Sequence, residues 1–155
     1  MDRGDQVLSS PRKVPRAPLL LGLGGLLPPA ALTLVALFDI GVFAPSTPGF
    51  VRSYAAVTLS FLGGSWWGFI VRDERPRWLL LVPSVLPSLL GWAAMFWFQP
   101  AEALFGLALL LVLALGVDAL LTGRGLTPRW WMRLRVPLSV GLALCCVLSG
   151  WALVN

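Results

Sequence analysis

Five apolar stretches, each about long enough to cross a lipid bilayer as a helix, dominate this sequence of 155 residues. They cover residues 19–38, 51–71, 78–98, 101–121 and 134–154. A hydrocarbon core about 30 Å thick requires roughly 20 apolar residues per helical crossing. Hydrophobic residues make up 57% of the chain and charged residues only 12%, a balance that soluble domains do not have. The sequence therefore predicts an all-α, polytopic membrane protein with a bundle of five transmembrane helices.

Basic residues fall almost entirely on one side of the predicted crossings. Eleven of the twelve Lys and Arg residues lie within 1–18, 72–77 or 122–135, and Arg52 alone lies on the other side. Cytoplasmic loops of membrane proteins are enriched in Lys and Arg. We therefore expect residues 1–18 to form a mobile basic tail in the cytoplasm and the C-terminus to lie outside. We expect the membrane to be a bacterial inner (plasma) membrane, or the mitochondrial inner membrane if the protein is organellar.

The net charge of +5 follows this one-sided pattern, which favours membrane lipids as partners over nucleic acid. Tryptophans near the ends of the crossings agree with it, because indole rings prefer the headgroup level. Those expected at the inner interface are Trp66, Trp67, Trp78, Trp130 and Trp131, and those expected at the outer interface are Trp97 and Trp151.

A secretory signal is the competing interpretation of the first stretch. Residues 19–27 would be its apolar core, and the small residues Ala30 and Ala31 would follow it. The stretch continues to Phe38, which is longer than a signal requires. A first transmembrane helix is therefore favoured.

The second predicted crossing carries a stripe of small residues. Ser60, Gly64 and Gly68 recur every four residues and so share one helical face. Such faces let another backbone approach closely, and this contact drives helix association in lipid. We expect tight packing within the chain, with a ligand or a partner helix against the glycines as the alternative. Gly64→Leu is then expected to weaken folding or association.

A similar stripe in the fifth crossing consists of Gly141, Cys145 and Ser149, and it too is expected to face protein and not lipid. Cys145 and Cys146, the only cysteines, are adjacent within an apolar run. We expect them to fill the core, and we expect neither a disulfide framework nor a zinc site.

Asp118 is the one charged residue clearly inside a predicted crossing, where burying a charge costs about 2.5–3.5 kcal/mol. It lies about one turn from the inner end of its helix. We expect it to pair with Arg124, Arg133 or Arg135 near the interface, and ligand or proton binding is the alternative. In the third crossing, Pro87 removes a backbone hydrogen bond and predicts a kink.

Three arginines beside two tryptophans form a second candidate site at the inner surface. Arg129, Arg133 and Arg135 flank Trp130 and Trp131 and are candidates to hold an anionic lipid headgroup, in a binding protein or in an enzyme that acts on lipid. Ordinary anchoring at the interface is the favoured explanation.

Catalytic machinery is not predicted. The chain has no histidine, no serine in a nucleophile elbow and no carboxylate pair placed for acid and base roles. Gly22, Gly24 and Gly25 begin an apolar stretch and follow no strand, so they are not a dinucleotide fingerprint. We therefore predict neither enzymatic activity nor a bound metal or cofactor.

The segment Ser-Phe-Leu-Gly-Gly-Ser-Trp-Trp-Gly over residues 60–68 resembles the bacterial and mitochondrial family that includes transmembrane protein 69. Val-Leu-Pro-Ser-Leu-Leu-Gly-Trp over 85–92, Asp118, and Pro-Arg-Trp-Trp-Met-Arg-Leu-Arg-Val-Pro over 128–137 support this resemblance. The likeness covers most of the chain after the basic tail. It implies a multi-helix inner-membrane protein and no particular activity.

Eight residues are candidates for helix packing or ligand contact: Ser60, Phe61, Gly63, Gly64, Trp67, Gly68, Pro87 and Asp118. The sequence predicts an accessory, scaffold or assembly component that contacts other membrane proteins. The alternative is a carrier or binder of a small ligand or lipid, with a cavity lined by Ser60, Trp67, Asp118 and the kink at Pro87. The tryptophan-rich sensory proteins also have five helices, but that likeness is one of architecture alone.

Overall fold

Five long α-helices make up most of this computed structural model, which describes residues 13–72 and 78–155. In chain order they are α2 (Arg16–Leu37), α3 (Thr47–Ile70), α4 (Trp78–Phe96), α5 (Pro100–Gly123) and α6 (Trp131–Ala152), with a short 3-10 turn, η1 (Ala44–Ser46), before α3. Each helix coincides with one predicted apolar stretch, and the described ranges contain no strand. The prediction of an all-α fold is confirmed.

Helix starts differ from the predicted bounds by a few residues. α2 begins at Arg16, so the last three residues of the predicted basic tail are helical, whereas residues 1–12 lie outside the described ranges. α3 begins at Thr47 with a proline in its first turn, where no backbone donor is lost. α5 begins at Pro100 after a capping box formed by Gln99 and Glu102.

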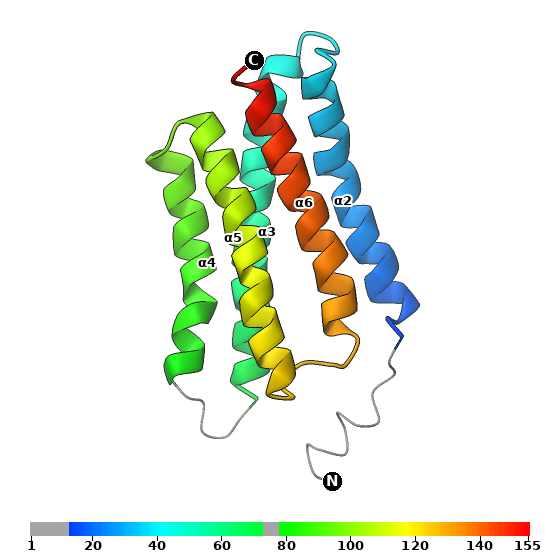
Figure 1. Ribbon diagram of the computed structural model, residues 1–155, viewed down its shortest axis with the longest axis vertical. Helices are drawn as coiled ribbons and strands as arrows, with labels where there is room; N and C mark the ends of the chain where they lie inside the picture. Colours follow the sequence, from blue (N-terminus) through cyan, green and yellow to red (C-terminus); the bar gives the residue numbers. More distant parts are fainter. Residues whose placement is uncertain (1–12, 73–77) are drawn as a thin grey trace.

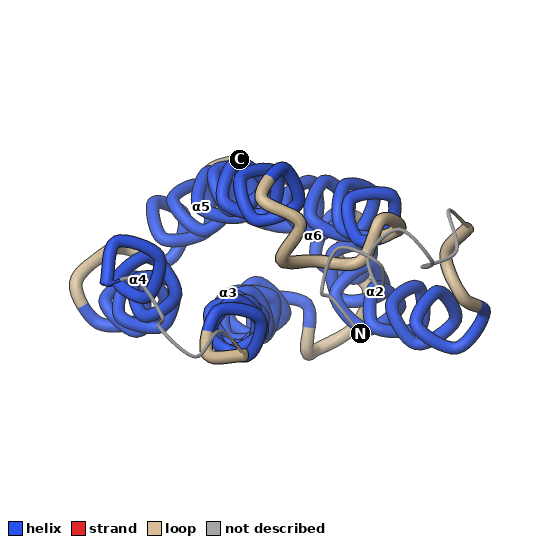
Figure 2. The backbone as a smooth tube through the Cα atoms, turned by 90° about the horizontal axis from the view of Figure 1, so that it is seen from below, coloured by secondary structure: helices blue, strands red, loops and turns tan. Residues whose placement is uncertain are grey.

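α3 contacts each of the other four helices, whose order along the chain can be followed in Figure 1. Viewed along the bundle, α3 lies between α4 and α2, while α5 and α6 run side by side across it (Figure 2). Residues on different faces of α3 therefore meet different neighbouring helices.

The core lies between α3 and the α5–α6 pair. Buried side chains recur every three or four residues, so one face of each helix is enclosed. On α3 these include Val51, Ala55, Leu59, Leu62, Trp66 and Ile70, and on α5 they include Leu104, Leu107, Leu111, Ala114, Asp118 and Leu121.

The outside of the bundle is apolar. Large apolar side chains are exposed on all five helices, among them Leu21, Val57, Leu79, Leu109 and Leu144. Water disfavours such a surface, whereas lipid accepts it. Within the described ranges, α2, α5 and α6 are each long and apolar enough to cross a bilayer, and α4 contains a shorter apolar helix over Leu81–Phe96. The chain thus has the apolar helices of a membrane protein.

Most of the described basic residues lie at one end of the bundle. This end holds the start of α2, the end of α3, the end of α5 and the start of α6, at the bottom of Figure 1. Lys13, Arg16, Arg72, Arg124, Arg129 and Arg133 are found there, whereas Arg52 lies in the second turn of α3, near the opposite end. Arg75 and Arg77 lie outside the described residues.

Between the adjacent glycines Gly63 and Gly64 of α3, it is Gly63 that lies against another helix. A methyl group on Gly63 would overlap the carbonyl oxygen of Ser84 on α4, and one on Gly91 of α4 would lie 3.1 Å from the carbonyl oxygen of Ala56. By contrast, Gly64 and Gly68 are exposed, and a methyl group on either would meet no atom within 4 Å. The prediction that the Ser60, Gly64 and Gly68 stripe packs within the chain is therefore wrong, because α4 packs against the neighbouring face.

The stripe on α6 does face protein. A methyl group on Gly141 would lie 3.0 Å from Leu26 of α2. The hydroxyl of Thr33, also on α2, shares a hydrogen bond of 3.0 Å with the Ser149 hydroxyl and lies 3.4 Å from the Cys145 carbonyl oxygen. The prediction for this stripe is confirmed. Cys145 and Cys146 are free thiols.

Candidate functional site

Asp118 is the centre of a buried polar network that joins three helices. Its carboxylate is 0% exposed and accepts three hydrogen bonds. Oδ1 accepts from the indole nitrogens of Trp66 on α3 and Trp131 on α6, at 2.8 and 2.7 Å. Oδ2 accepts from Nε of Arg135 on α6, at 3.0 Å, and Nη2 of Arg135 donates to the Ser139 hydroxyl at 2.9 Å. The charge of Asp118 is thus paired, and both of its oxygens are hydrogen-bonded.

The position of the α6 side chains follows from their spacing. Trp131, Arg135 and Ser139 recur every four residues and therefore share one face of the helix. The ring of Phe69 on α3 meets the Trp131 ring edge to face, with centroids 5.0 Å apart. This contact helps to fix the indole toward Asp118.

The turn between α5 and α6 also contributes to the position of the network. Gly125 has a φ of +68°, and its amide donates to Thr122, while the Leu126 amide donates to Leu121. These bonds form a Schellman motif, which ends α5 five residues after Asp118. The hydroxyls of Thr122 and Thr127 then join the end of α5 to the following loop at 2.8 Å.

The expected ion pair of Asp118 is confirmed, and its partner is Arg135, one of the three candidates. Two expectations are wrong. Trp66 is 2% exposed and donates to Asp118, so it is a core residue and not an interfacial anchor. Arg135 is buried within α6, so it cannot hold a lipid headgroup at the surface together with Arg129 and Arg133, which are exposed.

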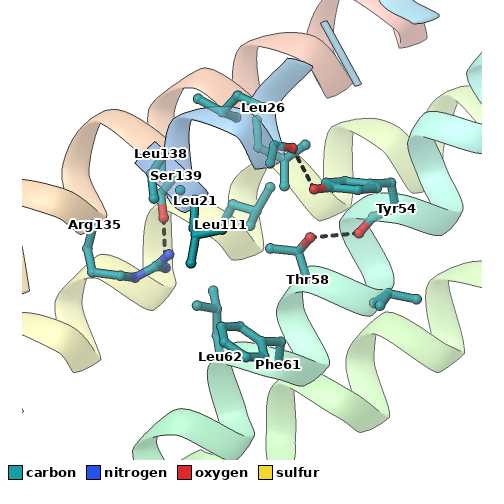
Figure 3. A pocket seen from close by; sticks show the side chains of 14 residues that line it. Leu21, Leu26, Tyr54, Thr58, Phe61, Leu62, Leu111, Arg135, Leu138 and Ser139 are labelled. Atoms are coloured by element: carbon teal, nitrogen blue, oxygen red, sulfur yellow. Dashed lines mark hydrogen bonds between the residues drawn. The ribbon is translucent and has the colours of Figure 1, made fainter. Parts of the chain in front are cut away.

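A pocket of about 350 Å³ lies beside this network, between α2, α3 and α6 (Figure 3). Most of its lining is apolar, and the polar side chains in it are Arg135, Ser139, Tyr54 and Thr58. The remaining lining residues are Leu21, Gly22, Gly25, Leu26, Val57, Phe61, Leu62, Leu111, Leu138 and Leu142. Figure 3 shows the Arg135 and Ser139 side chains at one end and Tyr54 at the other.

At the Tyr54 end of the pocket, a proline explains the position of the phenol. Pro29 has no N–H, so the Gly25 carbonyl four residues earlier lacks its helical donor. The Tyr54 hydroxyl donates to this carbonyl instead and so joins α3 to α2. The Thr58 hydroxyl donates to the Tyr54 carbonyl oxygen at 2.8 Å. Both hydroxyl hydrogens are therefore used within the protein.

The cavity expected from Ser60, Trp67, Asp118 and Pro87 is not formed. Asp118 is enclosed behind Arg135, and Pro87 lines a separate apolar pocket of about 190 Å³ between α3, α4 and α5. Neither Ser60 nor Trp67 lines either of these two pockets, and the Ser60 hydroxyl donates to the Ala56 carbonyl oxygen of its own helix. Of the eight candidates, Phe61 alone lines the larger pocket.

Tyr54, Thr58 and Ser139 were not among the predicted site residues. One available signal was the four-residue spacing of Trp131, Arg135 and Ser139, which places an arginine among polar neighbours on one face. The other was the position of Pro29, which requires an outside donor for the Gly25 carbonyl. Neither signal identifies the helix that supplies the partner.

Comparison with known proteins agrees with the predicted resemblance. Residues 14–150 match a family described as a protein of unknown function, DUF3429. The chain is 33% identical over 135 residues to transmembrane protein 69 of Xenopus tropicalis, which covers 83% of this chain and 51% of that protein. It is 31% identical over 129 residues to transmembrane protein 69 of Mus musculus, which covers 79% and 50%.

The chain spans about half the length of these curated relatives, and the search of solved structures gave no significant match. The family match, in contrast, includes all five helices except the last two residues of α6. The chain therefore belongs to the DUF3429 family and is similar to transmembrane protein 69 of vertebrates.

Proposed function

We propose that this protein binds an amphiphilic small molecule or lipid within the membrane, in the pocket between α2, α3 and α6. The pocket itself carries this proposal. Its volume of about 350 Å³ lies in the range of small-molecule sites, which are mostly apolar with a few polar groups that fix orientation. Arg135 and Ser139 are the groups suited to that purpose.

The ionised pair beside the pocket supports the same proposal. Charged side chains within membrane helices are expensive to bury, and in general they mark ligand or ion sites. Arg135 pairs with Asp118 through Nε and also lines the pocket, so the cation of this pair lies within reach of a bound molecule. We propose binding and not catalysis, since the polar groups at the pocket are an arginine and hydroxyls held by bonds within the protein.

The proposal includes five transmembrane crossings with the N-terminus in the cytoplasm and the C-terminus outside, in a bacterial inner membrane or its mitochondrial counterpart. The gathering of described basic residues at one end of the bundle supports this orientation. Arg135, one turn into α6, then lies on the cytoplasmic side of the membrane centre.

A second candidate function is that of an accessory, scaffold or assembly component that contacts other membrane proteins. The observation in its favour is the exposed face of α3. A methyl group on Gly64 or Gly68 would meet no atom of another described helix within 4 Å, and small residues of this kind permit close packing of a second helix.

A pair of valine variants tests the proposed pocket. Val57 lines the pocket and is 69% exposed, whereas Val112 on α5 is 48% exposed and lines neither pocket. The unaltered chain and the variants Val57→Trp and Val112→Trp are each purified in mild detergent, and the lipids they retain are measured by native mass spectrometry. Val57→Trp is expected to lose a ligand that Val112→Trp retains. Equal ligand content in both variants, or no ligand in the unaltered chain, would contradict the proposal.

A further inference from the structure

We propose that the pocket selects a neutral amphiphile whose polar end is a hydrogen-bond acceptor, such as a ketone or ester carbonyl. This inference rests on the proposed function of the pocket and adds the chemical class of its ligand. It follows from which hydrogen-bond donors the pocket presents and from the charge balance around them.

The polar end of the pocket presents N–H donors. A guanidinium has five N–H groups. Within the described residues Arg135 uses one of them to reach Asp118 and one to reach Ser139, which leaves three. The carboxylate that would attract a donor, Asp118, is fully buried and does not line the pocket. A ligand that reaches this end therefore meets donors and is recognised through an acceptor.

Charge balance determines which kind of acceptor fits. Among the described residues, Arg135 is the only charged one that lines the pocket, and Asp118 already neutralises it at 3.0 Å. An anionic head would place a second negative charge close to Asp118 in a medium of low dielectric constant, where uncompensated charge is costly. An ammonium head would be repelled by the positive charge of Arg135. A neutral carbonyl accepts a hydrogen bond and leaves the pair balanced.

The rest of the pocket accepts an apolar tail. The hydroxyl hydrogens of Tyr54 and Thr58 are bonded to backbone carbonyls, so they do not compete for the polar end of a ligand. The part of α6 that lines the pocket, from Arg135 to Leu142, is about two helical turns or roughly 10 Å long. The ligand then lies with its carbonyl toward the basic end and its tail toward the middle of the bundle.

Four photoreactive probes of equal chain length test this assignment: a long-chain methyl ketone, a fatty carboxylate, an alkylammonium and an alkane, each with a diazirine in its chain. The unaltered chain in maltoside micelles is labelled with each probe, and labelled residues are mapped by mass spectrometry. The ketone is expected to label residues of the pocket, such as Val57 and Phe61, at an at least tenfold lower concentration than any other probe.

The outcomes separate the two proposals. If no probe labels the pocket, the proposed function fails together with this inference. If the carboxylate, the ammonium or the alkane labels it as well as the ketone does, the pocket binds amphiphiles but the inferred head preference is wrong.

A variant of Arg135 gives an independent measurement. The double variant Asp118→Asn, Arg135→Leu removes the donors, keeps the site neutral and retains an oxygen for the two indoles. In it the preference for ketone over alkane is expected to fall below twofold, and an unchanged preference would overturn the role of Arg135. If this variant does not fold, the comparison of the four probes on the unaltered chain still decides the question.

Discussion

Trp66 and Trp131 donate their indole N–H groups to the same carboxylate oxygen, Oδ1 of Asp118, from two different helices. Oδ2 accepts from Arg135, so the carboxylate is satisfied from α3 and α6 together. Because every donor comes from another helix, the network reports on how α3, α5 and α6 are assembled and not on any helix alone.

The two indole bonds are expected to be coupled. Trp66→Phe or Trp131→Phe alone leaves Oδ1 with one donor, whereas the double variant leaves it with none. We expect the double variant to lose about 1–2 kcal/mol more of the free energy of unfolding than the sum of the singles, because the unsatisfied oxygen then keeps its full burial penalty. Steric-trap unfolding in bicelles measures this difference. Trp78→Phe, at an exposed position, is the control, and strictly additive costs would contradict the shared acceptor.

Breaking the ion pair from one side is expected to be worse than removing both charges. Asp118→Asn leaves the Arg135 charge buried without a counter-charge, and about 3–5 kcal/mol of stability should be lost. Arg135→Leu has the corresponding effect on Asp118. The double variant Asp118→Asn, Arg135→Leu should be more stable than either single variant. A double variant that is less stable than both would show that the charges contribute independently.

Adjacent glycines provide a matched test of helix packing. Gly63→Ala places a methyl group against the Ser84 carbonyl of α4 and should destabilise the fold by about 1–3 kcal/mol through overpacking. Gly64→Ala meets open space and gains helix propensity, so it should be neutral or slightly stabilising. SDS titration followed by far-UV circular dichroism compares the two variants. Equal losses of stability in the two variants would contradict the contact between Gly63 and α4.

The bond from Tyr54 to Gly25 is expected to depend on Pro29. Tyr54→Phe leaves the Gly25 carbonyl without a donor and should cost about 1–2 kcal/mol. Pro29→Ala restores the backbone N–H, so the same tyrosine change should cost less in that background. A double-mutant cycle on unfolding free energies gives the difference. The same cost in both backgrounds would mean that the tyrosine acts by packing alone.

The proposed orientation is open to a reporter test. Alkaline phosphatase fused after Phe98, between α4 and α5, should be active because the proposed orientation places that loop outside. Green fluorescent protein fused after Gly125, between α5 and α6, should fluoresce because the same orientation places that loop in the cytoplasm. The reverse pattern of reporter activity would contradict the proposed orientation.

The helices were predictable because each depends on a long local run of apolar residues. The rotation of each helix about its own axis was not predictable in the same way. Gly63 and Gly64 differ by about 100° around α3, and both faces contain small residues. Which of the two faces packs against α4 depends on Ser84 and Gly91 of α4. The spacing of residues within α3 contains no information about these partners.

The candidate site was predictable only in part, for the same reason. An aspartate inside an apolar run required a cation nearby, and three arginines between residues 124 and 135 were available. Burial of Trp66 and the pocket beside Arg135 depend on how three helices meet, so no local pattern indicates them.

The pairing of Asp118 with Arg135 also bears on biosynthesis. The two residues are 17 positions apart, on consecutive helices joined by a short loop. When α5 leaves the ribosome, its carboxylate has no counter-charge until α6 follows, and lipid accepts the neutral pair more readily than the lone anion. The two helices are therefore best integrated by the translocon as one hairpin, after α3 has been inserted and its Trp66 indole can donate to Asp118.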